Sequence, residues 1–337
     1  MKIILDGMGG DHAPGVIIEG AIAAIRSMDH QIVLVGQEDV LTAELERQGY
    51  SGKQISVVHA SQAIDCNEPP VKAVRTKKDS SIVKGLTMLK EGEGDAFLSA
   101  GSTGALLAGG LFNLGRIQGI DRPTLGTIYP VMGHAPSFLT DAGANAECKA
   151  QNLLEFGIMG STYMEKVLGV ENPTVGLINN GAEEGKGTTL TKAAYELLDK
   201  SSLNFIGNVE ARELPFGAAD VLVADGFTGN ACLKLTEGMA MMVLRELKRR
   251  FTSSGKAKLG ALMLKNQLMD IRKEFDYAEY GGAPILGVKG AMLKMHGSSN
   301  ALAVQKTIEK TIPFVEQNVI GIIQSSVLEI EEIMIRE

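Results

Sequence analysis

The sequence predicts an α/β fold in which helices cover both faces of a largely parallel sheet. Short apolar runs alternate with helical patterns along most of the 337 residues. Many of these runs are continuously apolar, which is typical of strands buried on both faces of a parallel sheet. Polar, glycine-rich turns follow the runs. Ligands in such folds bind outside the carboxyl ends of the strands, so these turns are candidates for the functional site.

The alternation predicts the positions of the strands and helices. Strands are expected at 2–6, 31–36, 55–60, 95–100, 124–131, 137–142, 174–179, 203–208 and 220–225. Helices are expected at 15–27, 39–48, 81–91, 103–115, 149–168, 187–200, 230–251 and 258–274.

The first strand ends in the turn DGMGGDHAP, which begins at Asp6. Its glycines allow close backbone approach, and the N-terminus of the next helix offers unpaired N–H groups to an anion. The candidate site residues here are Asp6, Gly9, Gly10, Asp11 and His12. A dinucleotide site is disfavoured, because the turn gives only G-x-G-G and no clear ribose-binding acid ends the second strand.

A second candidate is the loop GAEEGKGT at residues 181–188, which follows a strand and opens a helix. It fails the spacing of a nucleotide phosphate loop, because only three residues separate Gly181 from Gly185 and a glycine interrupts the Lys-Thr pair. The Lys186 side chain and the backbone amides are still suited to an oxyanion. The candidates in this loop are Asn180, Gly181, Glu184 and Lys186.

Four further loops place hydroxyl, amide or carboxylate groups at the start of a helical pattern. They are SAGSTGA (99–105), DAGANAEC (141–148), DGFTGN (225–230) and HGSSN (296–300). Helix capping alone explains the hydroxyls of the first loop equally well. The candidates are Ser99, Ser102, Thr103, Asp141, Asn145, Asp225, Thr228, Asn230, His296 and Ser298. Because the polar loops follow strands, we expect them to converge on one edge of the sheet.

Composition excludes several classes of function. The net charge of −7 argues against a general nucleic-acid binder, and no apolar run reaches the length of a membrane span. The three cysteines form no CxxC pair and the five histidines show no ligand spacing, so we expect no metal site and a reducing, cytoplasmic location. Cys148 follows a polar loop, but we expect an inert buried thiol there rather than a nucleophile.

The segment from about 230 to 274 differs from the rest of the chain. Residues 234–273 hold ten Lys or Arg and three Asp or Glu, a local charge of +7. Apolar residues at helical spacing form one stripe, which comprises Leu235, Met239, Met242, Val243 and Leu247. Four explanations stay open: docking of an acidic partner, contact with an anionic membrane, a dimer contact, or a core stripe with a solvated basic face.

Seven motifs taken in order resemble the bacterial phosphate acyltransferase family of phospholipid synthesis. They are DGMGGDHAP, SAGSTGA, DAGAN, NNGAEEGKG, DGFTGN, EYGGAPILG and HGSSN. The resemblance implies a Rossmann-like α/β/α sandwich with a mostly parallel sheet, related to the isocitrate dehydrogenase and phosphotransacetylase folds. We therefore expect one acyltransferase domain over 1–337, with the basic helical pair as an insertion.

The resemblance also implies an activity and partners. Members of the family convert acyl-acyl carrier protein and inorganic phosphate into acyl phosphate and free carrier protein, and we expect no cofactor. They form homodimers, are cytoplasmic or peripherally membrane-associated, and hand acyl phosphate to a membrane glycerol-3-phosphate acyltransferase.

The chemistry expected of the polar loops is direct attack of phosphate on a thioester, without a covalent enzyme intermediate. We expect phosphate near Gly9, Gly10, Asn180, Gly181 and Lys186. His12 or His296 would orient phosphate or protonate the leaving sulfur, and Asn145, Thr228 and Asn230 would donate hydrogen bonds. Asp6, Asp11 and Asp225 would position these donors, because bare carboxylates repel phosphate.

Two other functions are compatible with parts of the sequence. An NAD(P)-dependent dehydrogenase shares the fold class but needs the ribose-binding acid. A non-catalytic adaptor for membrane or carrier protein would use the basic helices and leave the polar glycine loops unexplained.

Overall fold

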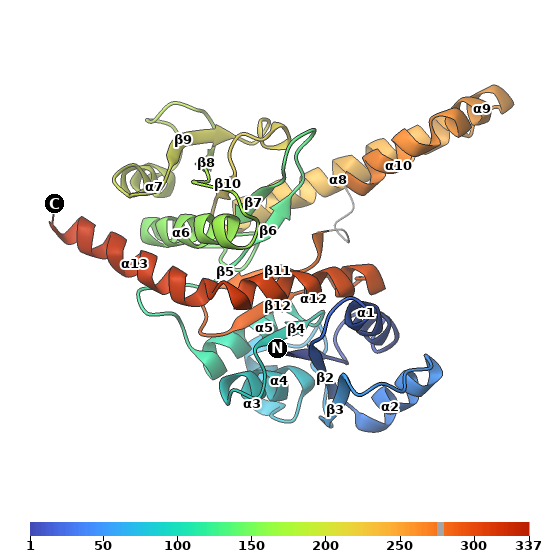
Figure 1. Cartoon of the computed structure of the whole chain (residues 1–337). Helices are drawn as coiled ribbons and strands as arrows, with labels where there is room; N and C mark the ends of the chain where they lie inside the picture. The colour runs from blue at the N-terminus through green and yellow to red at the C-terminus, as the bar shows by residue number, and fades with distance from the viewer. Residues whose placement is uncertain (275–279, 337) are drawn as a thin grey trace.

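The computed structural model describes residues 1–274 and 280–336 and confirms the α/β class (Figure 1). Within these residues the strands form two sheets, of seven and five strands, and most neighbouring strands run parallel. The second sheet was not foreseen from the sequence.

The seven-stranded sheet has the order β3-β2-β1-β4-β12-β11-β5. Its strands are β1 (Lys2–Asp6), β2 (Gln31–Gly36), β3 (Ile55–His59), β4 (Ala96–Ser99), β5 (Thr124–Leu125), β11 (Ala283–Leu286) and β12 (Ala291–Lys294). The neighbouring pairs β3–β2, β2–β1, β1–β4 and β4–β12 are parallel. Strand β11 runs antiparallel to both of its neighbours, β12 and β5. The carboxyl ends of β1, β4 and β12 therefore lie side by side.

The five-stranded sheet has the order β6-β7-β10-β8-β9. Its strands are β6 (Thr127–Tyr129), β7 (Ser137–Thr140), β8 (Val175–Asn179), β9 (Phe205–Glu210) and β10 (Val221–Val223). The strand expected at 124–131 is divided at Gly126, so that β5 joins the first sheet and β6 the second. A Cβ atom at Gly126 would lie 2.2 Å from the Phe138 ring, which shows how closely the chain passes over β7 at the division.

The helices agree with most of the expected ranges. They are α1 (Gly15–Ile25), α2 (Glu38–Arg47), α3 (Pro70–Thr76), α4 (Ser81–Lys90), α5 (Thr103–Gly109) with a π-helical turn at Gly110–Leu114, α6 (Ala150–Lys166), α7 (Thr189–Asp199), α8 (Gly226–Phe251), α9 (Gly255–Met263), α10 (Lys265–Glu274), α12 (Ala301–Glu316) and α13 (Val319–Arg336), with a 3-10 turn at Leu214–Phe216. The short helix α3 and the last two helices are additions to the expected set.

Helices cover both faces of the seven-stranded sheet. Alternate residues of a strand point to opposite faces, so Ile3 and Leu5 meet α1 and α12 while Ile4 meets α4 and α5. An aromatic stack joins the two sheets: the Tyr163 ring on α6 lies 4.4 Å from the Phe138 ring on β7 and 6.1 Å from the Phe314 ring on α12. One buried apolar cluster therefore contains side chains from both sheets.

The last two helices and the basic helices occupy contrasting positions. α12 and α13 run across the boundary between the sheets, whereas α8, α9 and α10 project away from the body of the molecule (Figure 1). Among the residues of α8 only Gly226 and Gly229 are buried. None of the helices in the described part of the chain is long and apolar enough to cross a membrane.

Candidate active site

A cavity of about 550 Å3 lies among the loops that follow the carboxyl ends of strands from both sheets. The loops after β4 and β12 contribute from the first sheet, and the loop after β7 and the first turns of α8 contribute from the second. Four predicted site residues line the cavity: Ser102, Thr103, Asn230 and His296. Polar lining residues that the sequence analysis did not single out are Cys66, Thr127, Lys234, Glu237, Lys294 and Ser299.

Lys294 is the cation held most deeply in this cavity. It is the last residue of β12 and stands opposite Ser99 in the parallel register with β4. Its Nζ donates a hydrogen bond to the carbonyl oxygen of Ala100 at 3.3 Å and another to that of Met295. An ammonium group has three N–H donors, so one is left for a ligand. Burial lowers the pKa of Lys294 to about 8, which still leaves the side chain mostly charged at pH 7.

His296 lines the same wall of the cavity as a neutral hydrogen-bond donor. Its Nδ1 lies 3.2 Å from the backbone N–H of Ser298, and because that group can only donate, Nδ1 accepts and the ring proton is on Nε2. The Ser298 hydroxyl also lies 2.8 Å from Nδ1. Partial burial and then the positive charges of Lys294 and Lys234 lower the pKa of His296 below its usual value of 6.5, which favours the neutral ring at pH 7.

Asp141 shapes the loop after β7 rather than meeting a ligand. Its carboxylate is buried, and it accepts hydrogen bonds from the backbone N–H groups of Leu125, Gly143, Ala144 and Asn145 and from the Asn145 side chain. The loop thereby turns Ala142 and Gly143 toward the cavity. Asn145 was expected to donate to substrate, but its amide is committed to Asp141 and to the Pro123 carbonyl oxygen at 2.8 Å.

The N-terminal turn lies behind the loop that follows β4. The buried Asp6 carboxylate accepts a hydrogen bond from the Ser99 hydroxyl at 2.6 Å, as expected of a group that positions others. A Cβ atom at Gly9 would lie 2.5 Å from that carboxylate and 2.7 Å from the Gly101 nitrogen, so a larger residue does not fit.

The next residues of the turn reach the loop after β12. Gly10 has a φ of 99°, and a Cβ atom there would lie 2.9 Å from that of Ala100. The Asp11 nitrogen donates to the Gly297 carbonyl oxygen at 2.8 Å. His12 is exposed and does not line the cavity. The turn therefore supports the cavity wall from behind.

Of the two hydrogen-bond donors predicted at the start of α8, Thr228 and Asn230, only Asn230 lines the cavity. Asp225 is the N-cap of α8, and its carboxylate accepts hydrogen bonds from the Thr228 nitrogen at 2.8 Å and the Thr228 hydroxyl at 2.9 Å. Thr228 is thus occupied by capping, whereas Asn230 lines the cavity beside Gly143. Ser102 caps α5 by accepting from the Ala105 nitrogen, which confirms the capping interpretation, and it also lines the cavity.

The loop at 180–186 corrects the expectation that all polar loops meet at one edge. It follows β8, which lies beyond β10 from the cavity-lining end of β7. Lys186, Asn180 and Glu184 are exposed, and these residues and Gly181 are not among those that line the cavity. The phosphate site expected from this loop together with Gly9 and Gly10 is not found in the cavity, because none of these residues is among those that line it.

Two comparisons place this geometry in a family. A family model described as "Fatty acid synthesis protein" matches residues 1–321. A protein of Alkaliphilus oremlandii named phosphate acyltransferase is 52% identical over 327 residues, which are 97% of each chain. The chain belongs to the phosphate acyltransferase family.

Further relatives and solved structures agree with this assignment. Phosphate acyltransferases of Clostridium acetobutylicum and Clostridioides difficile are 50% and 48% identical, and each match covers 95% of this chain and 97% or 94% of the relative. A phosphotransacetylase from Streptococcus pyogenes superimposes with a TM-score of 0.62 at 15% identity, covering 95% of this chain and 94% of that one. A branched-chain phosphotransacylase from Enterococcus faecalis gives 0.59 at 13%, covering 94% and 99%. The structural matches show a shared fold.

This phosphate acyltransferase family member is therefore an acyltransferase, which excludes both the dehydrogenase and the non-catalytic adaptor as its main function. A 4-hydroxythreonine-4-phosphate dehydrogenase from Klebsiella pneumoniae does share the fold, with a TM-score of 0.53, 13% identity and coverage of 93% of this chain and 98% of that one. The dehydrogenase expectation thus matched the fold class and not the activity.

Cys148 is poorly suited to be a nucleophile. Burial, together with the nearby charges of Asp141 and Asp225, raises the pKa of its thiol to about 11. Its Sγ donates to the Asn145 carbonyl oxygen at 3.4 Å, and Cys148 is not among the cavity-lining residues. These observations argue against an acyl intermediate on Cys148.

Glu155 introduces a pH dependence into the stability of the enzyme. Its side chain on α6 is only 1% exposed, and burial raises its pKa from 4.5 to about 7. The folded state therefore binds the proton more tightly than the unfolded state does. The stability that protonated Glu155 contributes is fully present below pH 4.5 and is lost as the pH rises through 7.

Glu155→Gln is expected to remove this dependence. Between pH 4 and pH 8, the free energy of unfolding of the variant should gain about 3 kcal/mol relative to that of the wild type. Denaturant titrations at the two pH values measure the difference. A difference that does not change with pH would show that Glu155 does not titrate on unfolding.

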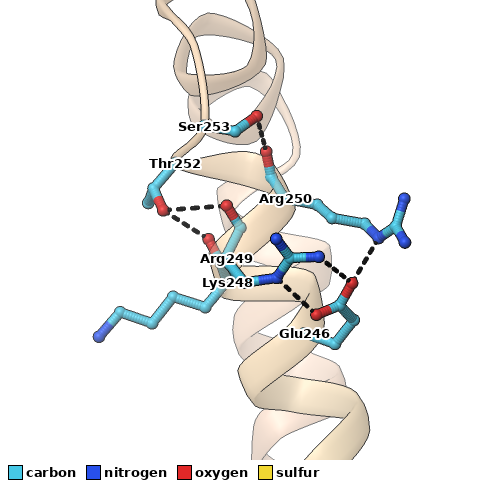
Figure 2. A network of polar contacts seen from close by, with 6 residues as sticks. All are labelled: Glu246, Lys248, Arg249, Arg250, Thr252 and Ser253. Carbon is cyan, nitrogen blue, oxygen red and sulfur yellow. Dashed lines mark hydrogen bonds and ion pairs between the residues drawn. The ribbon is translucent and has the colours of Figure 1, made fainter.

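The basic helices carry the predicted apolar stripe on an exposed surface. Leu235 is 67% exposed, and Met239, Met242 and Val243 are also exposed, so the stripe is not part of this chain's core. Figure 2 shows that the basic end of α8 is partly self-neutralised: Glu246 pairs with both Arg249 and Arg250 at 2.7 Å. The Thr252 and Ser253 hydroxyls cap the last carbonyl groups of the helix in the same view.

Proposed function

We propose that this enzyme transfers a long-chain acyl group from acyl-acyl carrier protein to inorganic phosphate, giving acyl phosphate for phospholipid synthesis. The observation that carries the proposal is the charge of the cavity. Two cations, Lys234 and Lys294, line it against one carboxylate, Glu237, in the part of the chain that the structure describes. The carboxylates of Asp6 and Asp141 bind neighbouring groups of the protein instead. Such a cavity suits a small anion that must approach a carbonyl carbon.

The proposed reaction needs no group beyond phosphate and the thioester. A phosphate oxygen forms a bond to the carbonyl carbon, and the carbonyl electron pair moves to oxygen to give a tetrahedral oxyanion. The oxyanion then collapses, the carbon–sulfur bond breaks, and the electron pair leaves with sulfur. The proton that monohydrogen phosphate gives up converts the thiolate into the free thiol of the carrier. Catalysis then consists mainly of orientation and of oxyanion stabilisation.

The lining residues divide between these tasks. We assign Lys294 to phosphate, because it is the most buried cation of the cavity and has a donor left over. His296 donates from Nε2 to phosphate or the oxyanion, and Asn230, Ser102 and Thr103 supply further donors. His12 and Lys186 make no direct contact with phosphate or the thioester in this proposal, because neither lines the cavity.

A coupled product assay tests the proposed function. Purified enzyme is incubated with long-chain acyl-carrier protein and phosphate, acyl phosphate is trapped with hydroxylamine, and the carrier's free thiol is titrated. We expect one acyl phosphate for each thiol, with both dependent on phosphate. Thiol release that continues without phosphate would identify a thioester hydrolase instead.

We further propose how the chain is organised and where it works. The core shared by the two sheets supports a single domain over 1–337, with the basic helices at about 230–274 as an insertion. The exposed apolar positions of α8, α9 and α10 support a homodimer contact and a peripheral membrane contact. A cytoplasmic enzyme of this kind would pass acyl phosphate to a glycerol-3-phosphate acyltransferase in the membrane.

A further inference from the structure

A second cavity, of about 420 Å3, adjoins the candidate active site through two shared elements. Helix α5 contributes Thr103 to the first cavity and Leu107 to the second, about one helical turn further along. The loop shaped by Asp141 contributes Gly143 to the first cavity and Ala144 to the second. The two cavities therefore have common walls.

Basic side chains outnumber acidic ones in this second cavity. Arg116 and Arg122 line it together with Asp121. Arg116 pairs with the Asp121 carboxylate at 3.1 Å. Arg122 makes no ion pair or side-chain hydrogen bond within residues 1–274 and 280–336, and Lys149 also lies close enough to act on Asp121. Three cations thus surround one exposed acid, which leaves an excess of positive charge.

Buried polar groups hold the arginine-bearing backbone in place. The Glu155 carboxylate accepts from the Asp121 nitrogen at 2.9 Å, and the Asn152 amide donates to the Asp121 carboxylate at 3.2 Å. The Asn145 amide donates to the Pro123 carbonyl oxygen at 2.8 Å. The segment that carries Arg122 is therefore fixed in advance by α6 and by the loop that forms the active-site wall. Preorganisation of this kind reduces the entropy lost on binding.

Apolar side chains extend the same surface. Leu111 and Phe112 are exposed on the π-helical turn after α5, with Leu111 lining the cavity. The Arg75 guanidinium lies 4.9 Å from the centre of the Phe112 ring. A surface that combines arginines with exposed aromatic and aliphatic groups is typical of protein interfaces.

We propose that this surface, the arginine face (Arg75, Leu111, Phe112, Arg116 and Arg122), docks the acidic carrier protein that delivers the acyl thioester. The inference rests on the proposed function, because it assumes that the donor is carried by a protein. An acidic carrier protein complements the excess positive charge of this face. Docking here places the carrier beside the cavity in which its thioester must react.

The basic helices fit this task less well. Arg249 lies about 22 Å along α8 from the cavity-lining Lys234, since each helical residue rises about 1.5 Å. Arg249 and Arg250 already share Glu246, and the helices project away from the body of the molecule (Figure 1). The arginine face instead shares its walls with the candidate active site.

Arg122→Glu tests the docking site. We expect at least a ten-fold increase in KM for acyl-carrier protein at low salt, while kcat and KM for phosphate stay within two-fold. Turnover of a carrier-free thioester, such as an acyl-N-acetylcysteamine, should be unchanged, and Arg122→Lys should restore most of the affinity for the carrier. Arg26→Glu is the matched control, because Arg26 is exposed at the end of α1 and undergoes the same change in charge.

Several outcomes would overturn the proposal. One is an unchanged KM for acyl-carrier protein in Arg122→Glu. The others are an equal loss of activity with acyl-carrier protein and with the carrier-free thioester, or an equal increase in KM in Arg26→Glu. Loss of flotation with anionic lipid vesicles at an unchanged KM would assign the face to a membrane and overturn it as well. If the wild type does not acylate phosphate, the proposed function fails, and direct titration of carrier protein against wild type and Arg122→Glu still tests docking.

Discussion

Replacing Lys294 with methionine is expected to reduce kcat/KM for phosphate by about 10²- to 10³-fold, the loss typical of removing one preorganised donor to a reacting anion. The ammonium group is buried beside the Ala100 carbonyl oxygen and keeps a donor for a ligand. Methionine has a similar length and no charge, so it preserves the packing and removes only the cation. In the wild type the same cation is lost above pH 8, so kcat/KM for phosphate should fall there as well.

A comparison with Lys186→Met tests which of the two lysines, Lys186 or Lys294, binds phosphate. Lys186→Met makes the same change on the exposed loop after β8, and we expect less than a three-fold effect. Initial rates over a range of phosphate concentrations, with thermal unfolding as a check on folding, measure both variants. A large loss in Lys186→Met together with wild-type rates in Lys294→Met would restore the phosphate site expected from the sequence.

Replacing Asp141 with alanine is expected to lower the free energy of unfolding by about 3–5 kcal/mol. The change removes one carboxylate but leaves four backbone N–H groups and the Asn145 amide without their acceptor in a buried loop. Because that loop carries Gly143 into the cavity, activity should fall with stability. Asp141→Asn keeps one acceptor oxygen and should lose less.

Urea denaturation followed by circular dichroism measures the effect. Glu184→Ala serves as the control, because it removes a carboxylate from an exposed loop and should change stability by less than about 0.5 kcal/mol. A loss in Asp141→Ala no larger than in the control would mean that water replaces the carboxylate in the loop.

The periodicity of the sequence was sufficient for most of the fold. Continuous apolar runs gave β1 and β2 with their observed bounds and placed β3, β4 and β8 to within a residue or two. These strands are recognisable because each is followed by a polar turn and an amphipathic helix. The family resemblance was confirmed by relatives that match nearly the whole chain.

Pairing between distant segments was not predictable in the same way. β11 and β12 have only four residues each and lie among glycines, and neither is among the strands that the alternation predicts; β11 lies within the family motif EYGGAPILG. Its first residue, Glu279, lies outside the described residues. Because β12 pairs with β4 from nearly 200 residues away, nothing local marked Lys294 as a cavity residue.

Four of the predicted site residues, Ser102, Thr103, Asn230 and His296, line the cavity. They could be predicted because polar groups that follow strands or open helices are visible in the sequence, and their roles in catalysis stay predictions. Asp6, Asp141 and Asp225 were visible for the same reason, but they bind neighbouring loop groups. A sequence shows which residues are polar, and it does not show which of them already have partners.

The place of β12 in the sheet has a consequence for biosynthesis. Its four residues form the strand next to β4, and they leave the ribosome after almost 300 residues have been made. Until then β1, β2, β3 and β4 can pair with one another, but the other edge of β4 is open to any strand that meets it. Pairing of β12 with β4 therefore closes that edge and brings Lys294 to the cavity in the same event. A nascent chain cannot form the complete cavity while the edge of β4 is still exposed.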